Sequence, residues 1–321
     1  MVEFGYAISS EEHAPNALVR NAQRAEELGF QFALISDHYH PWIDVQGHSP
    51  FVWSVIGAIA ATTRSLRLGT GVTAPIMRIH PAIIAQAAAT SACMMPGRFF
   101  LGVGTGEALN EHITGEHWPM ITERQDMLVE AIEIIRLLWS GEEVNYWGDF
   151  FTVENARIYT LPDQEIPLYI AASGTESAQL AGENGDGFIS TKADEKLIQE
   201  FRDGGGEGKP TYGKVTFCWA DTEDKALDTV HKYWPTAAIP GSLHADLPTP
   251  AHFEDAAKLV KKEDLKDMAL GPDPERFMKE IQAMLDAGFE HVYLHQIGPD
   301  QDGFFRFYER ELQQRIKRLA D

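Results

Sequence analysis

The segment Phe32-Ala33-Leu34-Ile35-Ser36-Asp37-His38 passes from four apolar residues directly into a hydroxyl, a carboxylate and an imidazole. Short apolar runs of this kind, separated by helical stretches, are typical of parallel βαβ units. The residues that close such a strand lie at the carboxyl edge of the sheet, where active sites form. The segment therefore predicts a buried strand whose end carries the chemistry of the protein.

Seven further runs resemble this one, at Val2–Ile8, Leu66–Val72, Phe99–Gly104, Pro167–Ala171, Gly187–Ser190, Lys214–Trp219 and His291–His295. An open Rossmann-type sheet normally needs fewer strands than eight. Eight strands with helical sequence between them favour a closed (β/α)8 TIM barrel. The whole chain, 1–321, is expected to form this single domain.

Helices and insertions are predicted between the strands. Apolar residues recur at helical spacing in 17–28, 127–139 and 277–287, and the first and last of these runs stop at a glycine. Residues 144–152 are interpreted as an inserted hairpin, and 204–208, with four glycines, as a mobile surface loop. The long excursion 236–267 precedes the last strand and is expected to cover the active site.

Composition limits the classes of partner. The net charge of −21 disfavours nucleic acid and anionic membranes as partners. The acidity fits either an ordinary solvated surface or adaptation to high salt. Two distant cysteines without C-x-x-C spacing, and no apolar run of ~20 residues, predict a cytoplasmic protein that does not span a membrane.

The densest chemical cluster is 36–42, which contains Asp37, His38 and Trp42. A neutral imidazole near pH 7 can accept a proton while a substrate hydroxyl loses hydride, and an indole can border a planar cofactor. One alternative is a capped loop with incidental histidines. Another is a metal loop with His40, Asp44 and His48, but no second ligand cluster supports it, so no metal is expected.

A glycine run, 102–106, follows the fourth strand and ends at Glu107 and Asn110. Its spacing is G-x-G-x-G, so the dinucleotide fingerprint G-x-G-x-x-G is absent. Glycines allow backbone amides to approach a flat or anionic ligand. Glu107 is a candidate acid opposite His38, with Asn110 as an orienting amide. The alternative is an acidic helix N-terminus without catalytic function.

Three further strand ends offer ligand-binding groups. Residues 69–75 and 171–175 supply backbone donors, the second as a candidate phosphate seat at a helix N-terminus or an ordinary turn. Lys192 follows the sixth strand. In so acidic a protein, it either binds an anionic substrate or is an ordinary surface lysine.

Taken together, residues 36–42, 78–86, 102–111 and 169–174 resemble the luciferase-like barrel oxidoreductases, with insertions at the C-terminal face of the barrel. Within that group the chain is similar to the glucose-6-phosphate dehydrogenases that depend on coenzyme F420 (8-hydroxy-5-deazaflavin). Segments 75–78 and 124–127 also resemble the F420-dependent secondary alcohol dehydrogenases. The resemblance implies a homodimer that transfers hydride between F420 and the carbinol or hemiacetal carbon of a small-molecule substrate.

The resemblance also implies roles for individual residues. His38 would take the hydroxyl proton of the substrate, Trp42 would pack against the reacting centre, and Glu107 would handle the proton at the cofactor ring. Glu11, Asn110 and Lys192 would bind the substrate. The ring would be supported by Asp37 and by a bulge at Gly71 and Val72, which is expected to contain a non-proline cis peptide; the cofactor tail would be held by Thr105, Gly106, Ser173, Gly174 and Thr175.

The family seats the sugar phosphate with three cationic side chains, and only Lys192 can be carried over. Glu254 and Asp255 stand near the second position, and nearby cations, Lys258, Lys261 and Arg276, would need a shift in register. A phosphate would lose hydrogen bonds worth ~1.5–3 kcal/mol each. Weak or absent activity on sugar phosphates is therefore expected, with a neutral secondary alcohol as the rival substrate. The remaining alternatives are an FMN-dependent luciferase-like monooxygenase and a non-catalytic deazaflavin-binding protein.

Overall fold

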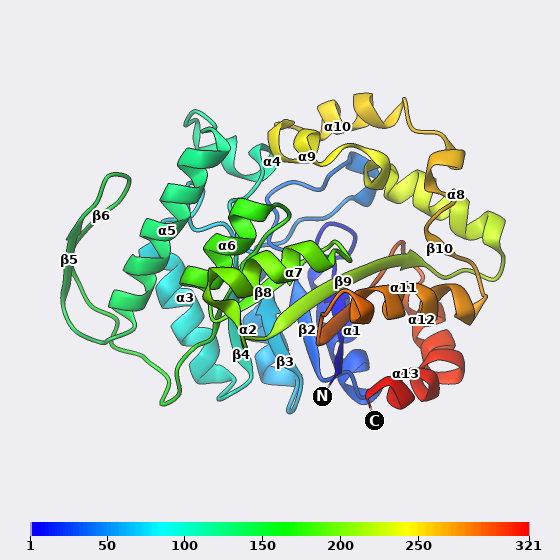
Figure 1. Cartoon of the computed structure of the whole chain (residues 1–321), viewed down its shortest axis with the longest axis horizontal. Helices are drawn as coiled ribbons and strands as arrows, with labels where there is room; N and C mark the ends of the chain where they lie inside the picture. Colours follow the sequence, from blue (N-terminus) through cyan, green and yellow to red (C-terminus); the bar gives the residue numbers. More distant parts are fainter. Residues whose placement is uncertain (1, 321) are drawn as a thin grey trace.

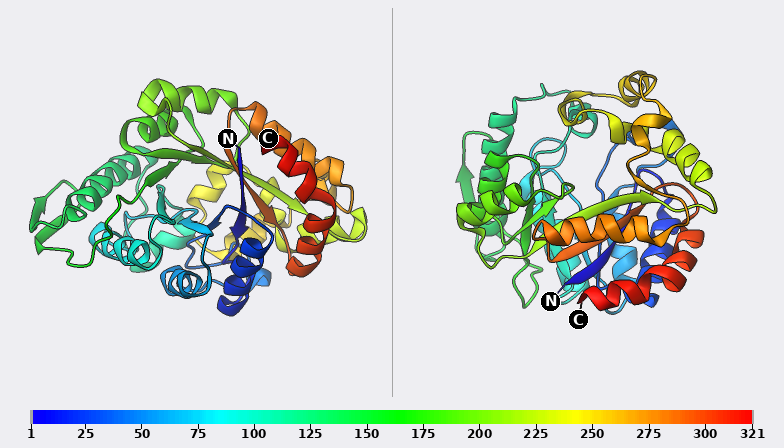
Figure 2. Two further views of the ribbon diagram at one scale, coloured as in Figure 1. Left: turned by 90° about the horizontal axis from the view of Figure 1, so that it is seen from below. Right: turned by 45° about the vertical axis from the view of Figure 1, so that its right-hand side comes forward.

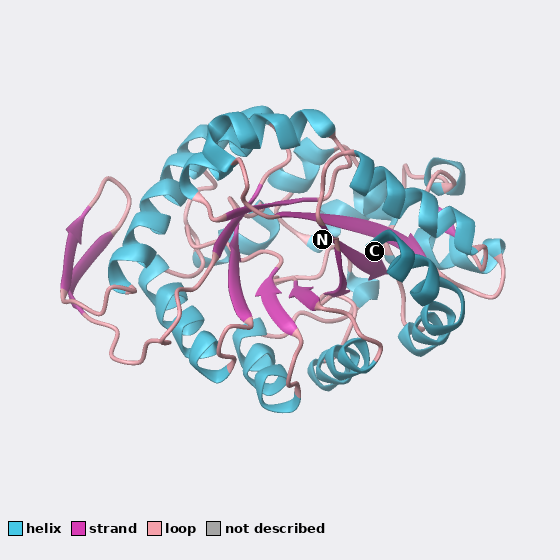
Figure 3. Cartoon of the chain, turned by 60° about the horizontal axis from the view of Figure 1, so that its bottom comes forward, coloured by secondary structure: helices cyan, strands magenta, loops and turns pink. Residues whose placement is uncertain are grey.

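The computed structural model describes residues 2–320, and its parallel strands close into a barrel surrounded by helices (Figure 3). β9 pairs with β8 on one side and with β11 on the other, which completes the ring. The predicted eight-stranded (β/α)8 barrel is confirmed. Its strands, in order around the ring, are β1 (Glu3–Ile8), β2 (Phe32–Ile35), β3 (Arg67–Thr70), β4 (Phe99–Val103), β7 (Leu168–Ala171), β8 (Gly187–Ser190), β9 (Thr211–Cys218) and β11 (His291–Gln296).

Helices cover the outside of the barrel (Figure 1). The helix predicted after the first strand is α1, and it is followed by Gly29 with a φ of 82°, a conformation that L side chains rarely adopt. Gly288 follows α11 in the same way, with a φ of 98°. The helices of the ring and of the C-terminus are α1 (Pro15–Glu27), α2 (Val52–Thr62), α3 (Pro81–Met94), α5 (Ile121–Leu138), α6 (Thr175–Asn184), α7 (Glu195–Phe201), α8 (Glu223–Tyr233), α11 (Pro274–Asp286), α12 (Gln301–Phe307) and α13 (Gln313–Ala320).

Large side chains fill the interior of the barrel. Alternate strand residues point inward, and the inward set is an aromatic cluster with Phe32, Phe100, Tyr169, Tyr212 and Tyr293. Glycines on neighbouring strands leave room for these rings: a Cβ on the glycine at 69 would lie 2.0 Å from the Phe100 ring. Because these side chains fill the interior, a ligand can bind only above them, at the carboxyl ends of the strands.

Two insertions decorate the barrel. The predicted hairpin is confirmed as β5 (Val144–Trp147) and β6 (Thr152–Ala156), and it projects from one side of the barrel (Figure 1). The excursion before the last strand folds into η4 (Pro235–Ala238), α9 (Gly241–Asp246), α10 (Pro250–Ala257) and η5 (Lys262–Leu265), followed by the two-residue strand β10 (Ala269–Leu270). α9 contacts the short helix α4 (Ala108–Glu111), so the excursion reaches the mouth of the barrel (Figure 2).

The glycine-rich segment 204–208 is not the free surface loop that its composition predicts. Residues Arg202–Gly206 form a π-helical turn that packs on α6. A Cβ on Gly204 would lie 2.5 Å from the carbonyl oxygen of Gln179, so the glycines permit a close backbone contact. Composition alone does not distinguish this use of glycine from a mobile loop.

Among the described residues, the helices are too short or too polar to cross a lipid bilayer.

Candidate active site

His38 and Glu11 form a buried pair at the ends of β2 and β1. Nε2 of His38 lies 3.3 Å from Oε1 of Glu11, and the two side chains are 8% and 4% exposed. Ser36 donates a hydrogen bond to the other oxygen of Glu11 at 2.5 Å. The neighbouring imidazole and this hydrogen bond lower the pKa of Glu11 even though burial opposes them. The carboxylate is therefore ionised and can stabilise positive charge on His38.

The opposite nitrogen of His38 has two neighbours. Nδ1 lies 3.1 Å from the carbonyl oxygen of His40 and 3.2 Å from the amide nitrogen of Asn110. If Nδ1 carries the proton, it donates to His40 and leaves Nε2 free to accept a proton. If Nε2 carries the proton, it donates to Glu11, and Nδ1 accepts from Asn110. Only the first tautomer can act as a base through Nε2.

Asn110 links His38 to Glu107. Its oxygen accepts hydrogen bonds from the backbone N–H groups of Tyr39 and His40, at 2.9 and 3.2 Å, which fixes the orientation of the amide. Its nitrogen consequently faces both Nδ1 of His38 and, at 3.2 Å, Oε2 of Glu107. Glu107 is half-buried and immediately precedes α4. The structure thus joins three of the predicted site residues in one chain of contacts.

Trp42 packs between His38 and the excursion 236–267. Its ring centroid is 5.0 Å from that of His38, and 5.1 Å from those of His244 in α9 and Phe253 in α10. Burial lowers the pKa of His244. The excursion therefore supplies one wall of the mouth, as the sequence predicts.

Asp37 lies in a buried ionic network. One oxygen is 2.9 Å from the guanidinium of Arg78, and the other accepts a hydrogen bond from Thr73 at 2.5 Å. Arg78 also contacts Glu111, and burial raises the pKa of Glu111 to about 7. The side chain of Asp37 is 0% exposed, and its hydrogen bonds are with Thr73 and Arg78. Sequence reasoning assigned no role to Arg78, Glu111 or Thr73, although Arg78 lies within a recognised motif.

The Gly71–Val72 peptide bond is cis, as the resemblance implies. Close to it, a Cβ on Gly104 would lie 2.9 Å from the Val72 side chain. Thr105 and Gly106 follow at the mouth, both partly exposed, and Gly106 has a φ of 65°. A surface with so few side chains fits a flat aromatic ring. The residues expected to support the ring of a deazaflavin are therefore compatible with it.

The turn at Ser173 and Gly174 precedes α6 on the same rim of the barrel. Gly174 is the N-cap of the helix and Thr175 its first residue, so free N–H groups are present for an anion. Lys192 is exposed, and its Nζ donates to the carbonyl oxygen of Ser173 at 2.8 Å. The structure thus brings Lys192 together with residues expected to hold the cofactor tail.

Of the other cations considered for a phosphate, Lys258 and Arg276 already have acidic partners. Lys258 is exposed and contacts Asp255 at 2.6 Å, while Lys261 lies on the surface. Arg276 contacts Glu223 at 2.8 Å and donates to backbone carbonyls beside β10. None of these contacts involves His38, Glu11, Asn110 or Glu107.

A small cavity lies beside Glu11, and residues that the sequence did not single out line it. Lys214 on β9 and His295 on β11 both line it. His295 pairs with the buried carboxylate of Glu12 at 3.1 Å. In the sequence, Lys214 and His295 stand out only as polar residues within apolar strands. Their importance becomes clear once the structure shows that their side chains face the inside of the barrel.

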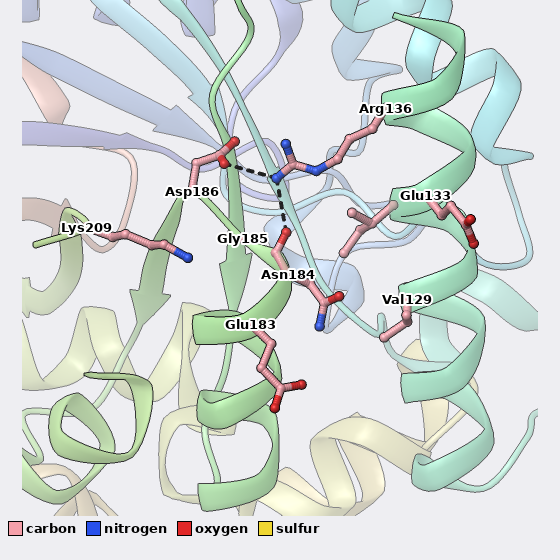
Figure 4. A pocket seen from close by; sticks show the side chains of 9 residues that line it. Val129, Glu133, Arg136, Glu183, Asn184, Gly185, Asp186 and Lys209 are labelled. Atoms are coloured by element: carbon pink, nitrogen blue, oxygen red, sulfur yellow. Dashed lines mark hydrogen bonds and ion pairs between the residues drawn. The ribbon is translucent and has the colours of Figure 1, made fainter. Parts of the chain in front are cut away.

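A larger groove, of about 730 Å³, lies on the outside of the barrel between α5 and α6 (Figure 4). Arg136 bridges it, donating to the carbonyl oxygen of Asn184 and to Asp186, both at 3.0 Å. Its lining residues contain none of the predicted site residues. The chemistry of the chain is therefore assigned to the barrel mouth.

Comparison with known proteins shows the family of the chain. The family model described as luciferase-like monooxygenase matches residues 2–291. F420-dependent glucose-6-phosphate dehydrogenases of Microbacterium testaceum and Mycobacterium tuberculosis are each 36% identical, over 99% of this chain and 98% and 99% of their own lengths. A solved F420-dependent secondary alcohol dehydrogenase, in complex with an F420–acetone adduct, superimposes with a TM-score of 0.89 at 31% identity, covering 96% of this chain and 97% of the other. On these matches, the chain belongs to the luciferase-like monooxygenase family.

Proposed function

We propose that this protein is an oxidoreductase that transfers a hydride between coenzyme F420 and the carbinol carbon of a neutral secondary alcohol. The observation that carries the proposal is the buried Glu11–His38 pair beside the cis Gly71–Val72 peptide. It combines a base for a hydroxyl proton with a surface for a flat ring. The relatives named for F420 support the choice of cofactor.

The residues of the site suggest the following division of roles. Bound F420 would supply the hydride acceptor. In the tautomer protonated at Nδ1, His38 accepts the hydroxyl proton at Nε2, and Glu11 stabilises the imidazolium that forms 3.3 Å away. Trp42 shields the reacting carbon from water, and Asn110 holds Glu107 in position for the proton at the ring.

The choice of a neutral alcohol rests on the cations. Of the cations that the resemblance offers for a phosphate, Lys192 alone remains, and its Nζ contacts Ser173 rather than His38 or Glu11. A phosphate dianion beside Glu11 and Glu107 would lack its charge-assisted hydrogen bonds. A sugar phosphate such as glucose 6-phosphate stays as the second candidate, favoured by the relatives named for it.

The test is the loss of the visible absorbance of F420 on addition of substrate to the purified protein. We expect bleaching with propan-2-ol and at least tenfold lower kcat/KM with glucose 6-phosphate. The variant His38→Asn should bind the cofactor and turn over neither substrate at more than a hundredth of the normal rate. Failure to bind F420, with oxygen consumed in the presence of reduced FMN, would instead identify a monooxygenase.

We further propose that the whole chain acts as one domain, in the cytoplasm, as a homodimer. Support for association comes from large apolar side chains exposed on the hairpin and nearby, such as Trp147 (72%) and Tyr159 (85%). Light scattering after gel filtration measures the mass. A value near 35.8 kDa, that of one chain, would refute the dimer.

A further inference from the structure

Lys214 points into the mouth of the barrel. It lies two residues after Tyr212, a member of the inward aromatic cluster, and side chains two apart on a strand share a face. It is opposite Tyr293 in the pairing of β9 with β11. The aliphatic stem of Lys214 therefore rises from the top of the aromatic layer, and its ammonium reaches the space above.

Lys214 lines the cavity beside Glu11, the buried partner of His38. Lys214, Glu11, Ser36, Tyr293 and His295 all line this cavity. Among residues 2–320, the Lys214 ammonium makes no hydrogen bond or ion pair, and the carboxylates that favour its charge are Glu11, Glu107 and Glu12. Three strong donors thus face a cavity that borders the proposed substrate site at Glu11.

The charges around Lys214 decide what it can bind. The carboxylates that favour its charged form are Glu11, Glu107 and Glu12, while burial lowers the pKa of the ammonium. The imidazoles at this end of the barrel are His38 and His295, each paired with one of these glutamates, and His244 beside Trp42. Negative groups outnumber the one ammonium, so a further anion is disfavoured, whereas a neutral oxygen can accept its hydrogen bond.

We propose that Lys214 is a specificity-determining residue that donates a hydrogen bond to a second, neutral oxygen of the substrate, so that the preferred substrates are vicinal diols or hydroxyketones. This inference rests on the proposed function, because it concerns the same site. In it, His38 acts on the reacting hydroxyl and Lys214 holds the neighbouring oxygen. A substrate without that oxygen leaves the ammonium unpaired in the cavity.

The test compares two substrates with one carbon skeleton, butan-2-ol and butane-2,3-diol. The wild type should prefer the diol in kcat/KM by about ten- to 150-fold, the range for a hydrogen bond to a charged donor. Lys214→Met should lose that factor for the diol, mostly through KM, and change butan-2-ol by less than twofold. Lys214→Arg should keep part of the preference. Lys196→Met, on the exposed surface of α7, is the matched control and should behave as the wild type.

A binding measurement separates the outcomes. The diol should raise the Tm of the wild-type complex with F420 and leave that of Lys214→Met unchanged, with the F420 dissociation constant equal in both. Equal losses for both substrates in Lys214→Met, or an unchanged preference, would overturn the role of Lys214 alone. A wild type that binds no F420 and oxidises neither alcohol would instead overturn the proposed function.

Discussion

Replacing Glu11 by glutamine tests whether its charge drives proton transfer to His38. The substitution keeps the size of the side chain and an oxygen that can accept from Ser36, but it removes the carboxylate 3.3 Å from Nε2. The imidazolium that forms when His38 accepts a proton then loses its charged partner. A hydrogen bond to a charged group contributes ~1.5–3 kcal/mol, so kcat should fall by about ten- to 150-fold.

The pH dependence gives a second reading of the same variant. The folded-state pKa of Glu11 is lowered, so its carboxylate is present above its ordinary pKa and is lost only as the pH falls through the lowered value. In the wild type, Glu11 therefore stays charged throughout the neutral range. The ratio of the wild-type kcat to that of Glu11→Gln should accordingly not change through titration of Glu11 between pH 6 and pH 8.

Glu12 provides the matched control for this experiment. It is equally buried, but it faces His295 at 3.1 Å and accepts from the backbone N–H of Gly298 at 2.8 Å. Glu12→Gln should lower Tm and change kcat by less than threefold. Single-turnover reduction of F420 by the alcohol measures the chemical step directly. Equal effects of Glu11→Gln and Glu12→Gln on that step would refute a specific role for the Glu11 charge.

Three further outcomes are expected. The pKa of Glu111 is raised to about 7, so the folded protein favours its protonated form. The free energy of unfolding should therefore decrease as the pH rises from 4.5 to 7. In urea titrations, Glu111→Gln should make this decrease smaller. Lys192→Met should weaken F420 binding in a salt-dependent way, with substrate KM little changed, because Lys192 contacts Ser173; an effect on KM alone would contradict this. Gly102→Ala should lower Tm by several degrees in calorimetry, since its Cβ would lie 2.1 Å from the carbonyl oxygen of Thr70; an unchanged Tm would contradict this packing.

The barrel could be predicted from the sequence because each of its strands is a short apolar run with a helix after it. The strand ends were also predictable, since parallel strands place their polar closing residues on one rim. Asp37 and His38 are adjacent in sequence, yet the structure gives them different partners, Arg78 and Glu11. Such partners are 27 to 41 residues away, and nothing in the local pattern specifies them.

Lys214 shows a second limit of sequence reasoning. Its strand was predicted to begin at Lys214, whereas β9 begins at Thr211 and includes Tyr212. A strand alternates its faces with every residue, so the inward side is known only once an inward neighbour is identified. With Tyr212 in the aromatic cluster, Lys214 must also face the barrel. Without it, a lysine at the start of a strand is interpreted as a solvated end.

Glu11 and Glu12 are consecutive in the sequence, yet their side chains have different partners, at the ends of two different strands. β1 lies between β11 and β2 in the barrel, so the segment that leaves its end has one neighbouring strand on each side. Both glutamates lie in the turn that follows β1, and there Glu11 contacts His38 beyond the end of β2 while Glu12 contacts His295 in β11. Two acids that look equivalent in the sequence thereby serve two different strands. Only Glu11 faces the proton acceptor, which is why the paired substitutions separate catalysis from stability.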